Sequence, residues 1–195
     1  MAGAVPRLCD PKERPSGSLM SVLPGMSSPG QMQRALPKDL HERLSSQEDD
    51  GPLVLAICMG LHMLFESSAE QGEPKSTGIA LLDGHVKRLD TLDGWTSGRD
   101  ARLPHVGWRS LTPTAGTTDS EWPVLVEPTS TFYFAHSFGV PYVGQPFVQQ
   151  IVNYAGVSLC AYVTQGRVHG VQFHPEMSGP PGIAFLKSLL RKASE

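Results

Sequence analysis

A short apolar segment that ends on a cysteine is the feature that most constrains the fold of this chain. Residues 53–57 (LVLAI) form a continuous apolar run, which is typical of a strand covered on both faces of a sheet. Cys58 and Gly60 follow directly, and apolar residues then recur at helical spacing over 61–65. The sequence therefore predicts a strand, a tight turn at Cys58 and a helix, as in α/β proteins.

Size, charge and cysteine content narrow the class of protein. The 195 residues are 39% hydrophobic and suffice for one substantial core, so we expect a single domain over 1–195. A net charge of −3 argues against nucleic acid as the main partner. The sequence has neither a membrane-length apolar run nor a signal peptide, so we expect a cytoplasmic protein. Cys9, Cys58 and Cys160 are widely spaced and are predicted to be free thiols.

The other elements are predicted from hydrophobic periodicity. We expect a strand at 19–23 and one amphipathic helix within 31–47, with Pro37 near its start. Residues 71–119 are rich in Gly, Pro, Asp and Thr and indicate hairpins and loops. The remaining predictions are strands at 131–138, 147–154, 158–165 and 168–174 and a helix at 182–194. This mixture indicates an α/β core with an antiparallel addition.

Cys58 is a candidate nucleophile. The pattern Ala56-x-Cys58-x-Gly60 is that of a strained strand-to-helix turn, with Cys in place of the more usual Ser. Ligands bind at the carboxyl ends of strands in open α/β sheets, and the start of the following helix favours a thiolate. A lone cysteine after an apolar run is nevertheless more often a buried structural residue, so a second feature has to support the assignment.

The stretch GVQFHPEMSG (170–179) supplies that second feature. His174 ends a strand-like run, Pro175 fixes a turn, and Glu176 lies where its carboxylate could hold the second imidazole nitrogen. A cysteine, a histidine and a glutamate together supply a nucleophile, a base and a group that orients the base.

With these motifs the chain resembles the class I, Cys-His-Glu glutamine amidotransferases, most closely the glutaminase subunits of imidazole glycerol phosphate synthase. The fold that the resemblance implies is an open, mostly parallel sheet flanked by helices with an antiparallel addition. Residues 1–18 match poorly. The matching stretches, in family order, are LPGMSSPG, LAICMGLHMLFESSAE, GIALLDGHVKRL, LPHVGWRSL, FYFAHSF and GVQFHPEMSGPPG.

The resemblance implies a role for each residue of the triad. Cys58 would attack the side-chain amide of L-glutamine to form a thioester, and His174 would protonate the departing ammonia and then activate water. Glu176 would orient His174. No metal or other cofactor is implied, and His105 and His136 have no carboxylate or cysteine at ligand spacing.

Two further sets of residues match family positions around the substrate. The oxyanion would be held by backbone N–H groups of Met59 and of the loop at Gly25 and Met26. The residues that match glutamine-binding positions are His62, Glu70, Ser137 and Phe138. His62 replaces the Gln that is usual at its position, and Ser27 replaces a Gly of the oxyanion loop.

The resemblance also implies a protein partner. In the family, ammonia passes through a tunnel into a (β/α)8-barrel cyclase, which makes imidazole glycerol phosphate and AICAR. We expect this cyclase to be a separate subunit that forms a heterodimer with the chain. LPHVGW (103–108) belongs to the face near that partner, although Trp108 could equally be a core or rim aromatic. Met177 replaces the Lys that commonly follows HPE in this branch.

The start of the sequence departs most from the family pattern. The family's first strand and first helix have no counterpart here, so we expect an N-terminally truncated chain, either begun at an internal Met or produced by a decayed gene. Three functions therefore stay open: a glutaminase subunit for the histidine pathway, an amidotransferase subunit for a different synthase, and a truncated, non-catalytic binding subunit.

Overall fold

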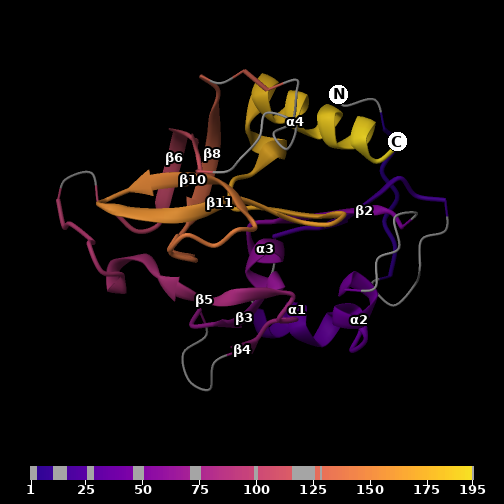
Figure 1. The fold of residues 1–195 in the computed structure, drawn as a ribbon, viewed down its shortest axis with the longest axis horizontal. Coiled ribbons are helices and arrows are strands. Elements are labelled where there is room, and N and C mark those ends of the chain that lie inside the picture. Colours follow the sequence, from indigo (N-terminus) through magenta and orange to yellow (C-terminus); the bar gives the residue numbers. More distant parts are fainter. Residues whose placement is uncertain are drawn as a thin grey trace.

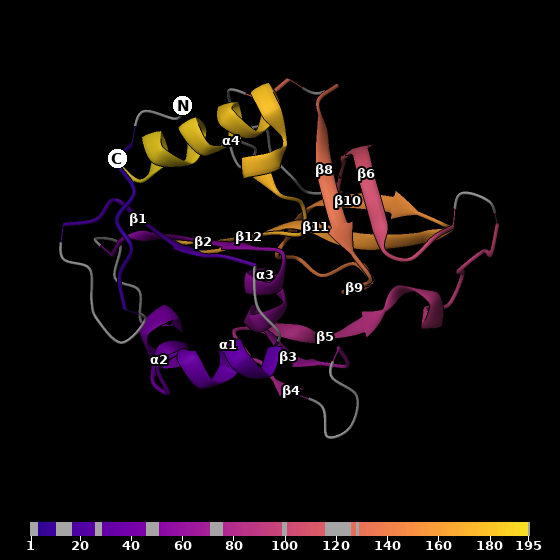
Figure 2. The same cartoon turned by 180° about the vertical axis from the view of Figure 1, so that it is seen from behind.

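The molecule has three layers, with a six-stranded sheet in the middle (Figure 1). The computed structural model describes residues 4–10, 17–25, 29–45, 51–70, 76–98, 101–115, 126–127 and 129–194. Helix α4 (Gly179–Lys192) covers one face of the sheet, and helix α3 (Met59–Leu64) lies against the other together with a smaller sheet (Figures 1 and 2).

The central sheet is parallel in one half and antiparallel in the other. Its strands lie in the order β1 (Met20–Leu23), β2 (Leu53–Ile57), β12 (Val168–Val171), β11 (Val157–Gln165), β10 (Val148–Tyr154) and β7 (Thr112–Pro113). Strands β1, β2 and β12 run parallel, whereas the pairs β12–β11, β11–β10 and β10–β7 are antiparallel.

The expectation of a mostly parallel sheet was therefore wrong for the β10–β12 half. Strands β10, β11 and β12 follow one another through very short connections, and a short connection can join only antiparallel neighbours. Ala155 and Gly156 both have positive φ angles, 50° and 83°, at the β10–β11 turn. This backbone twist is the one that tight hairpins favour. The rest of the expected architecture, an α/β core with an antiparallel addition, is confirmed.

Strand β2 is buried along its whole length, as its apolar run predicts. Its side chains alternate between two cores. Leu53, Leu55 and Ile57 join the cluster under α4, whereas Val54 and Ala56 join the cluster on the α3 side. Because both faces of the strand are covered, a strand with an apolar–polar alternation would not fit here.

Helix α4 is attached to the sheet mainly by aromatic side chains. The Phe185 ring, which is fully buried, makes edge-on contacts with Phe132, Tyr162 and Phe173 at centroid distances of 5.3–6.3 Å. Aromatic rings bury large apolar areas and favour such edge-on geometry, so this cluster fixes α4 over β12 and β11.

The smaller elements form two groups. A second sheet has the order β4 (Ser76–Thr77), β3 (Phe65–Ser68), β5 (Leu82–Arg88) and β9 (Phe138–Gly139). Strands β6 (His105–Ser110) and β8 (Thr131–His136) form an antiparallel ribbon beside α4 (Figure 2). The 3-10 helices are η1 (Leu89–Thr91) and η2 (Pro175–Met177). The strands and the C-terminal helix predicted from periodicity are thus present, with ends that differ by a few residues.

The expectation of one helix within 31–47 was wrong in number: a helix does start shortly after Pro37, but a second helix precedes it. The structure has two short helices, α1 (Pro29–Ala35) and α2 (Leu40–Ser45), on either side of Pro37. Proline disfavours the helical conformation in the residue before it, which here is Leu36, so the first helix ends there. Residues 46–47 lie outside the described residues.

Three buried histidines have strongly lowered pKa values. His105 and His169 are 0% exposed and His136 is 5% exposed. Burial, reinforced by nearby cationic groups, lowers the pKa of His105 to about 4 and that of His169 to about 3. Burial and the neighbouring His105 lower the pKa of His136 to about 3. All three are therefore neutral in the folded protein at neutral pH.

We predict that the free energy of unfolding falls as the pH drops from 6.5 towards 4. The unfolded chain protonates these histidines near pH 6.5, whereas the folded chain protonates them only near pH 3–4, so the unfolded state binds more protons in this window. Replacing one of them, His169→Phe, should flatten the pH dependence by about 1 kcal/mol per pH unit. Urea unfolding between pH 5 and pH 6.5 measures this.

The control variant is Phe185→Leu, which weakens the same aromatic cluster without removing a titrating group. It should lower stability equally at every pH. A pH slope in His169→Phe equal to that of the unmodified chain would contradict the account of buried neutral histidines.

No helix among the described residues is long and apolar enough to span a membrane.

Candidate active site

Cys58 lies in the predicted turn, between the end of β2 and the start of α3. Its φ and ψ angles are 49° and −102°, a strained conformation for a residue other than glycine. Its own N–H donates to the Val171 carbonyl (2.7 Å), and its carbonyl accepts from the His62 N–H (3.0 Å). Backbone bonds to β12 and α3 therefore hold the strained turn in place.

Gly60 and Gly25 allow two other segments to approach this turn. A Cβ atom at Gly60 would overlap the Leu23 carbonyl oxygen at the end of β1, so α3 could not start so close to that strand with a larger residue. A Cβ atom at Gly25 would lie 2.9 Å from both Cys58 Cβ and Met59 N. The loop after β1 thus comes directly against the cysteine.

His174 and Glu176 are in contact, as the HPE motif predicts. His174 Nδ1 and Glu176 Oε1 are 2.7 Å apart, and Glu176 belongs to η2. Hydrogen bonds to Cys58 and to Glu176 outweigh burial and raise the pKa of His174 to about 10. Burial alone would raise the pKa of Glu176. The hydrogen bond with His174, a backbone hydrogen bond and the charge of His174 together outweigh burial and lower this pKa. His174 is therefore a cation at neutral pH, with a carboxylate on one nitrogen and the cysteine on its other side.

The backbone around His174 is held by Ser178, which is fully buried. The Ser178 hydroxyl donates to the His174 carbonyl (2.6 Å) and accepts from the Tyr133 N–H (3.0 Å). The His174 N–H in turn donates to the Tyr133 carbonyl (2.8 Å). The loop that carries the histidine is thereby fixed to strand β8.

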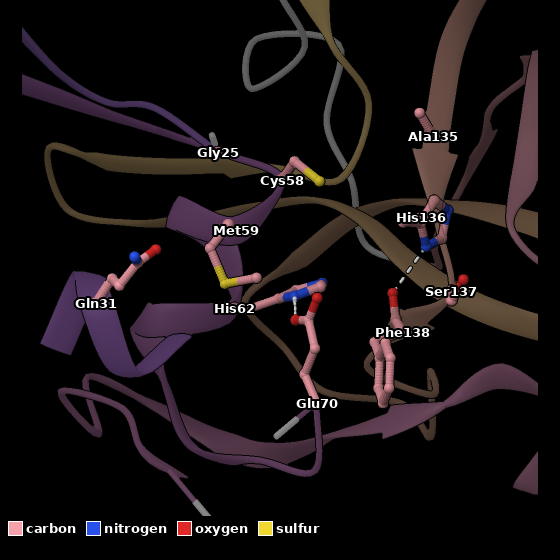
Figure 3. Close-up of a pocket in the computed structure, with 10 residues that line it drawn as sticks. All are labelled: Gly25, Gln31, Cys58, Met59, His62, Glu70, Ala135, His136, Ser137 and Phe138. Carbon is pink, nitrogen blue, oxygen red and sulfur yellow. Dashed lines mark hydrogen bonds and ion pairs between the residues drawn. The ribbon is translucent and has the colours of Figure 1, made fainter. Parts of the chain in front are cut away.

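Cys58 opens into a pocket of about 400 Å³ (Figure 3). Its walls come from the loop after β1, from helices α1 and α3, from Glu70 just after β3, and from the β8–β9 segment. The lining residues are Gly25, Gln31, Cys58, Met59, His62, Glu70, Ala135, His136, Ser137 and Phe138.

Most residues selected from the sequence as substrate or oxyanion residues meet at this pocket. His62, Glu70, Ser137 and Phe138 line it, as do the oxyanion candidates Gly25 and Met59. Met59 is the first residue of α3, so its N–H has no acceptor within the helix and is available to an oxyanion. Met26 and Ser27 lie outside the described residues.

His62 is more enclosed than a simple substrate ligand would be. Its side chain is 2% exposed, and its Nε2 is 2.9 Å from Gln172 Oε1. On the opposite side its Nδ1 is 3.5 Å from Glu70 Oε2, an ion pair whenever His62 is protonated (Figure 3). Both ring nitrogens therefore already face polar groups of the chain itself.

Gln172 is a residue of the site that the sequence analysis did not select. Its side-chain amide lies between His62 and Cys58, with Nε2 3.7 Å from the Cys58 sulfur. Gln172 precedes His174 by two residues, and alternate residues of an extended segment share a face. This spacing was the available signal, but the contact with His62 is not visible in the sequence.

His136 and His105 form a second polar pair beside the pocket. His105 Nδ1 is 3.0 Å from His136 Nε2, and His136 Nδ1 donates to the Phe138 carbonyl (2.7 Å). The pair thus braces the backbone of residues 136–138, which lines the pocket. Within the described ranges, no three His, Cys, Asp or Glu side chains gather as a metal site would require.

Comparison with known proteins agrees with this geometry. The family model described as glutamine amidotransferase class-I matches residues 11–193. The imidazole glycerol phosphate synthase subunit HisH of Bacillus velezensis is 34% identical over 176 residues, which cover 89% of this chain and 78% of that protein. The protein of the same name from Thermosynechococcus vestitus is 30% identical, covering 97% of this chain and 86% of its own length.

Solved structures show the same fold at lower sequence identity. A crystal structure of a glutamine amidotransferase has a TM-score of 0.59 and 18% identity, covering 92% of this chain and 82% of that one. The structure of PurLQS from Thermotoga maritima has a TM-score of 0.56 and 18% identity, covering 93% and 82%. Taken with the family match over nearly the whole chain, these likenesses lead to one conclusion: the chain belongs to the class I glutamine amidotransferases.

Proposed function

We propose that the chain is the glutaminase subunit of a two-subunit imidazole glycerol phosphate synthase. It would hydrolyse L-glutamine to glutamate and ammonia, and the ammonia would pass to a separate (β/α)8-barrel cyclase that makes imidazole glycerol phosphate and AICAR. The observation that carries the proposal is the Cys58–His174–Glu176 arrangement at a pocket in a chain whose relatives are named HisH.

The geometry supports a thioester mechanism. The Cys58 thiolate attacks the side-chain amide carbon of glutamine, and the oxyanion accepts hydrogen bonds from backbone N–H groups near Met59 and Gly25. His174, protonated at neutral pH because its pKa is about 10, gives its proton to the departing nitrogen, which leaves as ammonia. The resulting neutral His174 then takes a proton from water, the hydroxide attacks the thioester, and glutamate leaves with the thiolate restored.

The remaining pocket residues suit a small zwitterionic substrate. Glu70 presents a carboxylate that would attract the glutamine ammonium group, and the Ser137–Phe138 backbone offers hydrogen-bonding groups on the opposite wall. Figure 3 shows the Glu70 carboxylate beside His62, with Ser137 and Phe138 on the other side of the pocket.

We predict that Cys58→Ala abolishes glutamate release, because no other thiol lines the described pocket. His174→Gln should reduce turnover by roughly 100-fold or more, since it removes the acid and the base of both half-reactions. The measurement is glutamate formed from glutamine by the chain with a separately expressed cyclase barrel.

The matched control is Cys160→Ala, which changes a buried cysteine outside the pocket and should retain turnover. Full glutaminase activity in Cys58→Ala would contradict the proposed mechanism. A folded, barrel-bound chain without any activity would instead favour a non-catalytic binding subunit.

The face of the β6–β8 ribbon is the proposed site for the cyclase. Val106 and Trp108 on β6 are 54% and 46% exposed, and Met177 in η2 is 59% exposed. The Trp108 ring contacts the Tyr133 ring edge-on at 5.9 Å, and the Tyr133 carbonyl accepts a hydrogen bond from the His174 N–H. An exposed apolar face directly beside the histidine is where ammonia could pass to a partner without entering bulk water.

We predict that Trp108→Ala weakens binding of the cyclase barrel by about 10-fold or more, because buried tryptophans dominate interface energies. Titration calorimetry between the two subunits measures this. Val22→Ala is the control, since Val22 is similarly exposed (45%) but lies on β1, on the opposite side of the molecule from the β6–β8 ribbon (Figure 2). Equal effects of the two substitutions would place the partner elsewhere.

A further inference from the structure

The amide of Gln172 connects the candidate nucleophile to His62. Gln172 is fully buried, and its backbone N–H donates to the Ala161 carbonyl (2.9 Å), so its main chain is fixed in the sheet. Its side-chain Oε1 is 2.9 Å from His62 Nε2, and its Nε2 is 3.7 Å from the Cys58 sulfur. The side chain therefore has one polar end on each of these two residues.

His62 determines which end of the amide faces the sulfur. In the orientation that the structure shows, the Gln172 oxygen accepts the 2.9 Å contact from a hydrogen on His62 Nε2. Held in this way, the amide can present only its NH2 group to Cys58. If the amide were reversed, its oxygen would face the sulfur and repel a thiolate, and its NH2 would face the Nε2–H group.

His62 is itself held on its far side. Glu70 Oε2 lies 3.5 Å from His62 Nδ1, within ion-pair distance, and neither atom has a hydrogen-bond partner among the described residues. Figure 3 shows the imidazole and the carboxylate facing each other across the pocket wall. Glu70, His62, Gln172 and Cys58 thus form a continuous chain of polar contacts.

We propose that Gln172 is a positioning residue for the nucleophile, and that His62 orients its amide so that an N–H donor faces the Cys58 sulfur and stabilises the thiolate. The inference rests on the proposed function in taking Cys58 as the nucleophile. A hydrogen bond to a charged acceptor is stronger than one to a neutral acceptor, so the donor favours the thiolate over the thiol.

The histidine at position 62 suits this role better than the glutamine usual in the family. A glutamine at this position could present either its oxygen or its NH2 group to Gln172, so it would permit both orientations of the Gln172 amide. An imidazole with hydrogens on both ring nitrogens, one towards Gln172 and one towards the Glu70 carboxylate, permits only the orientation in which the Gln172 oxygen faces His62. The replacement of Gln by His62 is therefore expected to change how strongly the Gln172 amide stabilises the Cys58 thiolate, in addition to any effect on glutamine binding.

The test is the pH dependence of alkylation of Cys58 by iodoacetamide in the full-length chain, followed by mass spectrometry of its peptide. Gln172→Met keeps the size of the side chain but removes the donor, and should move the alkylation midpoint about 1 pH unit upward. Gln172→Glu keeps the shape but replaces the donor with an acidic group, and should move the midpoint further. His62→Gln should give a smaller upward movement.

Cys160 supplies an internal reference in the same experiment. Burial raises the pKa of Cys160 to about 12, so its reactivity should stay low and unchanged in every variant whose fold is intact. A rise in Cys160 reactivity reports loss of structure. In that case the remaining folded variants, His62→Gln among them, decide the question.

Unchanged Cys58 profiles in folded Gln172→Met and Gln172→Glu would overturn the proposal. Steady-state kinetics with glutamine provide a second readout. We expect Gln172→Met to lower kcat with little change in KM, whereas an effect on KM alone would show that the contact serves substrate binding. Alkylation requires no turnover, so shifted profiles in a chain without glutaminase activity would contradict the proposed function and leave this inference standing.

Discussion

The parallel pairing of β2 with β12 is the interaction on which the site depends. Val171 lies opposite Ile57 in this pairing, so the residues that follow each strand leave the sheet side by side. The Cys58 N–H donates to the Val171 carbonyl (2.7 Å) across the same pair. Cys58 and the Gln172–His174 segment, far apart in the sequence, are therefore brought together by backbone hydrogen bonds.

Burial of β2 on both faces makes that pairing rigid enough to hold an unfavourable conformation at its end. The strand contributes alternately to two apolar clusters, and the aromatic contacts of Phe185 fix α4 above one of them. Residues in sparsely populated φ/ψ regions persist only where their surroundings determine them, and Cys58 has a positive φ of 49°. Packing of the core around β2 thus offsets the unfavourable backbone conformation of Cys58.

The sequence allowed the turn at Cys58, the His174–Glu176 contact and most strands to be predicted, because each depends on residues close together in the chain. A helix starting near Pro37 was expected, but helix α1 before the proline was missed, because the apolar residues on both sides of Pro37 were assigned to one helix. The antiparallel half of the sheet was underestimated because the resemblance implied a mostly parallel one. The Glu70–His62–Gln172–Cys58 contacts could not be predicted, since they join residues from three separate segments.

The central claim is that Cys58 forms a covalent intermediate with glutamine. The most direct measurement is a rapid acid quench of the chain, mixed with glutamine and the cyclase barrel, followed by peptide mass spectrometry. The account predicts a glutamyl thioester on Cys58 that forms with release of ammonia and disappears as glutamate is released. Glutamate release without any adduct on Cys58, or an adduct on a different residue, would contradict it.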